Sequence, residues 1–123
     1  MGVLTLATIL AANDLKRETV AVPEWGGDVL VQELSATHRE EVFALTHGKT
    51  DIERGRVFRR AILARALVDE NGAPMFSDAE GLNVAAPIDS LMAKSAAVVD
   101  RLAEVALKLS GLGQSAEGDA KNA

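Results

Sequence analysis

Cysteine is absent from the 123 residues of this chain. Its absence excludes disulfide bonds, thiolate nucleophiles and every zinc site that needs a cysteine ligand. Imidazole is scarce as well, because His38 and His47 are the two histidines of the sequence. They fall at opposite ends of one expected helix and point to different faces, so one metal ion cannot use both. We therefore predict no metal site.

Long apolar runs are also missing. The stretch GVLTLATILAA, residues 2–12, is shorter than the roughly twenty apolar residues that a membrane-spanning helix needs. It also lacks the leading positive charges of a signal peptide. We expect no membrane contact and a location in a cytoplasm.

No arrangement of catalytic residues stands out. The sequence holds no Gly-X-Ser-X-Gly motif and no phosphate-binding glycine loop. The acidic pairs Glu40–Glu41 and Asp69–Glu70 lie in polar stretches, which suit a solvated face better than a general acid. We predict that the chain is not an enzyme, with no catalytic residue and no cofactor.

The sequence does contain the pattern of a small α+β domain. Its length and its apolar fraction of 48% suit one domain with a modest core. Val20 and Val22 form one period-two run, and Val29 and Val31 form another, on either side of ProGluTrpGlyGly. Two such runs joined by a glycine-containing turn predict a β-hairpin.

Helical periodicity covers most of the remaining chain. Thr37 with Glu40, and Ser77 with Glu80, match the capping box that opens a helix. In the first of these helices, Val42 and Phe43 are expected to belong to the buried stripe. The expected helices cover residues 5–13, 37–47 and 51–69, a short segment after residue 77, and a last helix that opens at Lys94 or Ser95 and runs to residue 110.

The predicted fold class is therefore α+β: an N-terminal helix, a β-hairpin and a predominantly helical remainder in one small domain over residues 1–110. From Gln114 onward the sequence has no large apolar residue, so it cannot bury enough surface to offset its ordering entropy. We expect a flexible polar tail over residues 111–123.

Arginine is concentrated in one expected helix, and two interpretations of this cluster stay open. The cluster could bind nucleic acid, or it could be a charged face that contacts acidic proteins or neighbouring subunits. The net charge of −5 makes the second interpretation the stronger one. The arginines are Arg54, Arg56, Arg59, Arg60 and Arg65.

Trp25 is the one tryptophan of the chain and falls at the tip of the expected hairpin. A tryptophan there either folds back onto an adjacent helix or stays exposed as a binding hot spot. The sequence leaves both alternatives open. The candidate protein-interaction residues are therefore Trp25, Arg56, Arg59 and Arg60.

The order of several short motifs resembles the tail assembly chaperones of long-tailed bacteriophages, over roughly residues 5–113. ValProGluTrpGlyGly precedes a helix opened by SerAlaThrHisArgGluGlu. An Arg-rich helix then leads into LeuValAspGluAsnGly and MetPheSerAsp, and LysSerAlaAlaValValAspArgLeu opens a helix that ends in LeuSerGlyLeuGly. Each motif alone is weakly specific, and the resemblance depends on their order.

This resemblance implies a non-catalytic protein of the bacterial host cytoplasm that is not part of the mature virion. Its implied partners are the tape-measure protein and the tail tube protein, together with further copies of itself. The resemblance also implies that a longer product is made by ribosomal frameshifting and that this chain is the short product. The alternative is a small DNA-binding or regulatory protein that uses the Arg-rich helix 54–65.

Overall fold

The computed structural model describes residues 2–78, 84 and 86–112. It contains the predicted N-terminal helix and hairpin followed by a mostly helical remainder, so the α+β class is confirmed. The elements are α1 (Leu6–Ala11), β1 (Arg17–Val22), η1 (Pro23–Trp25), β2 (Gly27–Gln32), α2 (Ala36–Thr46), α3 (Asp51–Ala66), β3 (Leu67–Val68), β4 (Phe76–Ser77), β5 (Ala86–Pro87), α4 (Ile88–Met92) and α5 (Ala96–Leu109).

The hairpin forms where the two alternating valine runs predict it. β1 and β2 are antiparallel, with Val20 opposite Val29 and Val22 opposite Gly27. Pro23–Trp25 make a short 3-10 turn, and Gly26 closes it with φ 79°. A φ in the left-handed region is accessible to glycine without steric cost, which explains the glycine at this position.

Helix α2 confirms the helix predicted over 37–47, with two corrections. Its N-cap is Ser35, whose Oγ accepts a hydrogen bond from the backbone N–H of His38 at 3.2 Å, so the predicted cap at Thr37 is wrong. Phe43 is 47% exposed, so its placement in the buried stripe is also wrong, whereas Val42 is fully buried. The Phe43 ring lies under the Arg39 guanidinium, whose Cζ is 5.7 Å from the ring centroid, and not in the core.

A third strand replaces the last turn of the helix predicted over 51–69. Helix α3 ends at Ala66, and β3 pairs antiparallel with β2, with Val31 opposite Leu67. The resulting sheet has the order β1-β2-β3. The edge strand β2 has backbone N–H and C=O groups that would stay unpaired if α3 continued for another turn. Pairing of these groups with β3 accounts for the change from helix to strand at Leu67.

The predicted helix cap at Ser77 is wrong. Ser77 lies in β4, which pairs in parallel with β5, and its Oγ donates a hydrogen bond to the Ala86 carbonyl at 3.1 Å. Residues 79–83, on which the rest of that helix was predicted, lie outside the described residues. The same is true of residues 113–123 of the predicted tail.

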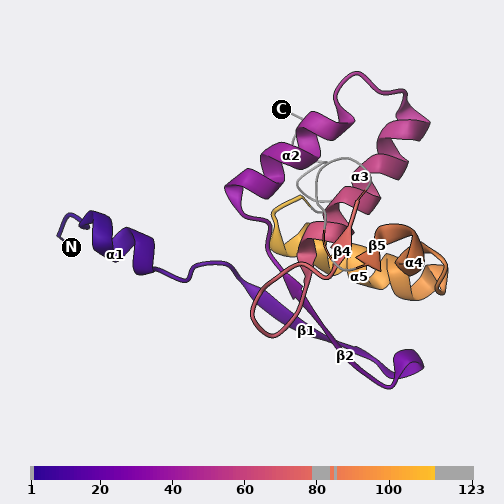
Figure 1. Ribbon diagram of the computed structural model, residues 1–123, viewed down its shortest axis with the longest axis horizontal. Helices are drawn as coiled ribbons and strands as arrows, with labels where there is room; N and C mark the ends of the chain where they lie inside the picture. Colours follow the sequence, from indigo (N-terminus) through magenta and orange to yellow (C-terminus); the bar gives the residue numbers. More distant parts are fainter. Residues whose placement is uncertain (1, 79–83, 85, 113–123) are drawn as a thin grey trace.

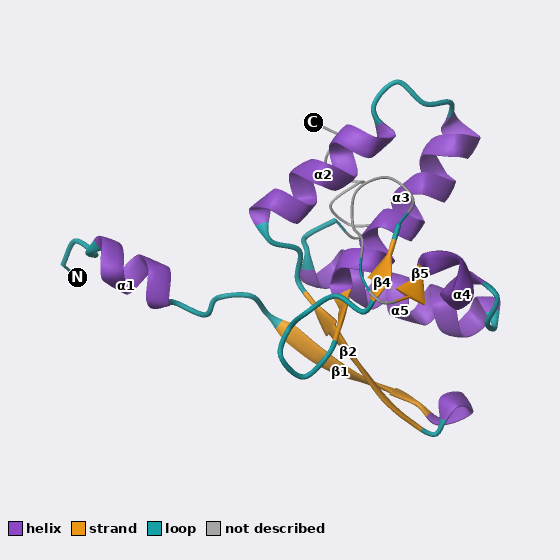
Figure 2. Ribbon diagram, in the orientation of Figure 1, coloured by secondary structure: helices purple, strands orange, loops and turns teal. Residues whose placement is uncertain are grey.

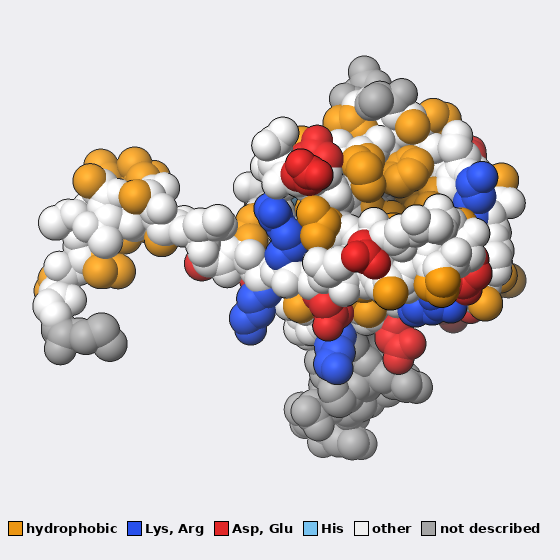
Figure 3. Space-filling model, turned by 90° about the horizontal axis from the view of Figure 1, so that it is seen from below, with side chains coloured by type: hydrophobic (Ala, Val, Ile, Leu, Met, Phe, Trp, Pro, Cys, Tyr) orange, Lys and Arg blue, Asp and Glu red, His pale blue; other side chains and the backbone are white. Residues whose placement is uncertain are grey.

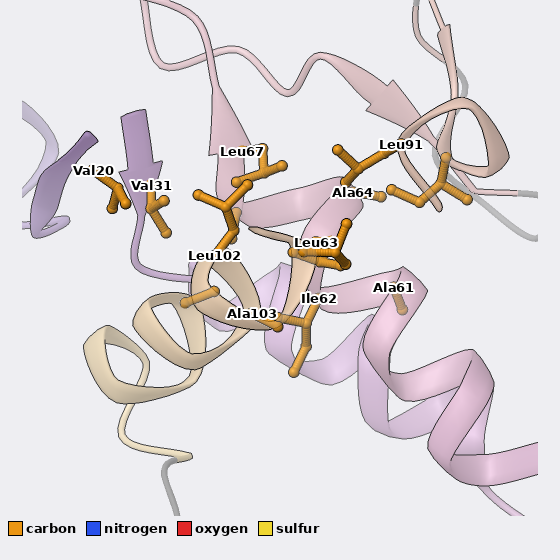
Figure 4. Packing of buried hydrophobic residues seen from close by; sticks show 14 of the residues in the cluster. Val20, Val31, Ala61, Ile62, Leu63, Ala64, Leu67, Leu91, Leu102 and Ala103 are labelled. Atoms are coloured by element: carbon orange, nitrogen blue, oxygen red, sulfur yellow. The ribbon is translucent and has the colours of Figure 1, made fainter. Parts of the chain in front are cut away.

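The core lies between the sheet and helices α3 and α5. Figure 4 shows Leu102 of α5 beside Leu67 and Val31 of the sheet, and Ala103 of α5 beside Ile62 of α3. Ile62, Leu63 and Leu102 are at most 1% exposed. Helix α1 takes no part in this core and stands apart from the rest of the molecule (Figures 1 and 2). None of the helices in the described ranges has both the length and the apolar character needed to cross a membrane.

Candidate interaction surfaces

Trp25 lies at the hairpin tip and remains 39% exposed. The tip itself is fixed by its neighbour Glu24, whose carboxylate pairs with the Arg101 guanidinium of α5 at 2.8 Å. Arg101 Nη1 also donates to the Ala21 carbonyl at 3.5 Å. The ion pair with Arg101 holds the pKa of Glu24 below its ordinary value. Helix α5 thus fixes the position of a partly exposed tryptophan.

The Arg-rich helix does not present one cationic face. Arg59 pairs with Asp100 of α5, and Arg60 Nε lies 3.3 Å from Asp89 Oδ1 of α4. Arg54 pairs with Asp51 at 3.6 Å. These carboxylates neutralise three of the clustered arginines, so a run of cations for phosphate binding does not form along α3.

Arg65 is buried, which the sequence did not indicate. Its side chain is 1% exposed, and Nε lies 2.9 Å from Glu41 Oε1. Nη1 lies 2.5 Å from Asp78 Oδ2 and also donates to the Ala61 carbonyl at 3.1 Å. Arg65 therefore joins α2, α3 and the residue after β4, and it is unavailable to an external partner.

Arg56 is exposed, like Arg54, but it forms no ion pair with any residue that the structure describes. It lines a cavity of about 400 Å³. Leu45, Val57, Pro87 and Ile88 supply apolar wall to this cavity, and Arg56, Arg60, Ser77, Asp78 and Asp89 supply polar wall. The structure thus places Arg56 and Arg60 at one cavity, whereas Arg59 is paired with α5 and Trp25 lies at the hairpin tip.

Helix α1 forms a further surface that sequence reasoning missed. The helix was predicted, but every one of its residues is exposed. Leu6, Ile9 and Leu10 are 73%, 55% and 75% exposed. Figure 3 shows hydrophobic side chains over the surface of α1. A narrow linker joins α1 to the body of the molecule. The lack of charged residues in 2–13 was a signal for such an arm. A helix that packs one face on a core carries charged or polar residues on its solvent-exposed face, and this stretch has no charged face.

The described residues hold no group of three or more His, Asp or Glu side chains with metal-binding geometry. His38 is the N3 residue of α2 and is half buried, and this burial lowers its pKa below the ordinary value.

Comparison with known proteins agrees with the arrangement of these elements. The family model described as phage tail assembly chaperone matches residues 5–122. The solved structure of the bacteriophage HK97 tail assembly chaperone is similar, with a TM-score of 0.55 and 24% sequence identity, and the alignment covers 85% of this chain and 95% of that chain. No curated protein sequence matches. Because the family model spans nearly the whole sequence, this chain belongs to the phage tail assembly chaperone family.

Proposed function

We propose that this chain binds the tape-measure protein of a long-tailed bacteriophage, recruits tail tube subunits to it in the host cytoplasm, and is absent from the mature virion. The observation that carries the proposal is the family match over residues 5–122. The chain acts by contact with other polypeptides and not as an enzyme. It also associates with further copies of itself, and it is the short product of a frameshifted pair.

The exposed apolar side chains support this role. A tape-measure chain presents long apolar helical faces before the tube encloses it, and such faces aggregate. The chaperone offers exposed apolar groups on separate elements: Trp25 on the hairpin, Phe43 on α2 and the residues of α1. Many weak contacts of this kind hold a long partner through avidity and still allow displacement by tube subunits.

Co-expression with the tape-measure protein tests the proposal. The chain is expected to keep that protein soluble and to be recovered with it, and Trp25→Ala is expected to weaken binding by at least tenfold as a hot-spot truncation. Arg56→Glu is expected to weaken it as well, because Arg56 is exposed and forms no ion pair with the described residues. Glu53→Ala is the matched control, since Glu53 is an exposed polar residue on α3, the helix of Arg56, and forms no ion pair with the described residues. Failure of the wild-type chain to retain the tape-measure protein would overturn the proposal.

The proposed frameshift is tested on the nucleotide sequence alone, without purified protein. The nucleotides past codon 110 are expected to contain a slippery run followed by a long overlapping reading frame. A stop codon without such a frame would remove the two-product part and leave the binding role intact.

A further inference from the structure

The arm formed by residues 2–13 has apolar side chains that are exposed and outside the core formed by the described residues. Besides the three exposed residues of α1, Val3 and Leu4 are 100% and 63% exposed. The two threonines of the arm are occupied locally: Thr5 Oγ1 accepts from the Thr8 N–H at 3.2 Å and shares a hydrogen bond with the Thr8 hydroxyl. A helix as short as α1 is not stable alone in water, so its stability requires a surface to pack on.

The cavity beside Arg56 has the size and character to receive this helix. Removal of one core leucine side chain leaves a cavity of about 150 Å³, so the cavity of about 400 Å³ has room for about two such side chains. Leu6 and Leu10 are one turn apart and share a face of α1. The apolar walls at Leu45 and Val57 match them in character.

The arm and the cavity also carry complementary charges. Asp14 is the first acidic residue after the uncharged arm, is exposed, and pairs with no cation in the described part of the chain. It follows the C-terminal end of α1, where unpaired carbonyl groups add partial negative charge. Arg56, at the cavity, carries an exposed guanidinium that has no ion-pair partner among the described residues.

The cavity of the same chain is poorly placed for its own arm. Helix α1 and two of the elements that line the cavity, α4 and β5, lie on opposite sides of the molecule, with the start of the hairpin and the helical body between them (Figures 1 and 2). The connection from Ala11 to Arg17 spans at most about 20 Å when fully extended. Docking between two copies brings the two surfaces together without folding the arm back across the sheet.

We propose that α1 of one copy docks into the cavity of a second copy, with Leu6 and Leu10 in the cavity and Asp14 beside Arg56. The inference rests on the proposed self-association and names the surfaces that produce it. The donor and acceptor surfaces differ, so one copy can give its arm and receive another at the same time, and assemblies larger than dimers follow.

The absence of cysteine makes disulfide trapping a direct test. Ile9→Cys and Val57→Cys are made in separate full-length chains, mixed and oxidised, and a disulfide-linked heterodimer is the expected product. Ile52→Cys replaces Val57→Cys as the control, because Ile52 is exposed on the same helix outside the cavity. Equal trapping with the control, or a predominant Ile9→Cys homodimer, would overturn the inference. Ile9→Cys with Val57→Cys in one chain tests the arm's own cavity, and a cross-linked monomer would likewise overturn it.

A charge exchange gives a second, independent readout. Asp14→Arg and Arg56→Asp are each expected to weaken self-association at least tenfold by light scattering, and the double variant is expected to restore it. Leu6→Ser with Leu10→Ser is expected to yield monomers whose circular dichroism spectrum loses no more than the signal of the six-residue helix α1, because these side chains are not in the core. If these variants assemble like the wild type, the arm inference fails and the proposed self-association stands. If the wild type is monomeric, self-association itself fails, while tape-measure binding is judged separately by co-expression.

Discussion

Replacement of Arg65 by Met tests whether the buried ion pairs hold the α2–α3 region to the residue after β4. Methionine keeps an unbranched side chain of similar length and removes the guanidinium. The change takes away three contacts, at 2.9 Å to Glu41, 2.5 Å to Asp78 and 3.1 Å to the Ala61 carbonyl. The Arg65 side chain is 1% exposed, so water cannot replace the charge and the hydrogen bonds that the guanidinium supplies.

The size of the effect follows from the exposure of the two carboxylates. Breaking a buried ion pair by removing one partner costs about 3–5 kcal/mol, whereas an exposed pair contributes about 0–1 kcal/mol. The Asp78 side chain is 7% exposed and belongs to the first class. The Glu41 side chain is 44% exposed and regains water when Arg65 is lost. We therefore expect a loss of about 3 kcal/mol in the free energy of unfolding.

Urea unfolding, followed by circular dichroism and by the fluorescence of Trp25, measures this loss. At a typical slope of about 1–3 kcal/mol/M, the midpoint falls by about 1–3 M. Arg60→Met is the matched control on the same helix, since the side chains of Arg60 and Asp89 are 31% and 82% exposed. The control is expected to lose less than about 1 kcal/mol. If both variants lose the same free energy, the burial argument for Arg65 is refuted.

Two further predictions concern glycine and pH. Gly72→Ala is expected to destabilise the fold by about 1–2 kcal/mol, because Gly72 has φ +81° and a Cβ there would lie 2.9 Å from Arg17 Nη2. Gly55→Ala, which has open space and lies inside α3, is expected to stabilise it by about 0.5–1 kcal/mol; the same sign for both changes in urea unfolding would contradict the reasoning. Arg101 lowers the pKa of Glu24 in the folded state. The ion pair therefore contributes to stability above pH 4.5, the ordinary pKa of the carboxyl, and this contribution is lost as the pH falls through the lower pKa of the folded state. The fluorescence of the adjacent Trp25 is expected to change with a midpoint below pH 4.5, and Arg101→Gln is expected to raise that midpoint; an unmoved midpoint would show that the pair does not control the hairpin tip.

Elements with a strong local signal were predicted well. The hairpin follows from two alternating valine runs and a glycine that reaches φ 79°. Helix α5 begins at Ala96 after Ser95, one of its two predicted openings, and its buried face includes Val98 and Leu102. In each case the residues that specify the element lie within it, so a single sequence is enough to identify it.

The sites were predicted less well, because they depend on contacts between distant segments. Five arginines close together in the sequence looked like one surface. In the structure four are paired with carboxylates, and one of these four, Arg65, is buried, while Arg56 remains exposed beside the cavity. The partners Asp89 and Asp100 come from α4 and α5, and nothing in the spacing of the arginines indicates them.

The sequence by itself determined the α+β class, the hairpin, the long helices and, through the order of its motifs, the family. Those features depend on periodicity, capping and turn residues, which act over a few positions. Only the tertiary structure decided that Leu67 joins the sheet opposite Val31, that Arg65 is buried between α2 and the end of β4, and that α1 stays outside the core. Each of these outcomes depends on which distant segments of the chain pack together after folding. A local sequence pattern contains no information about those distant partners.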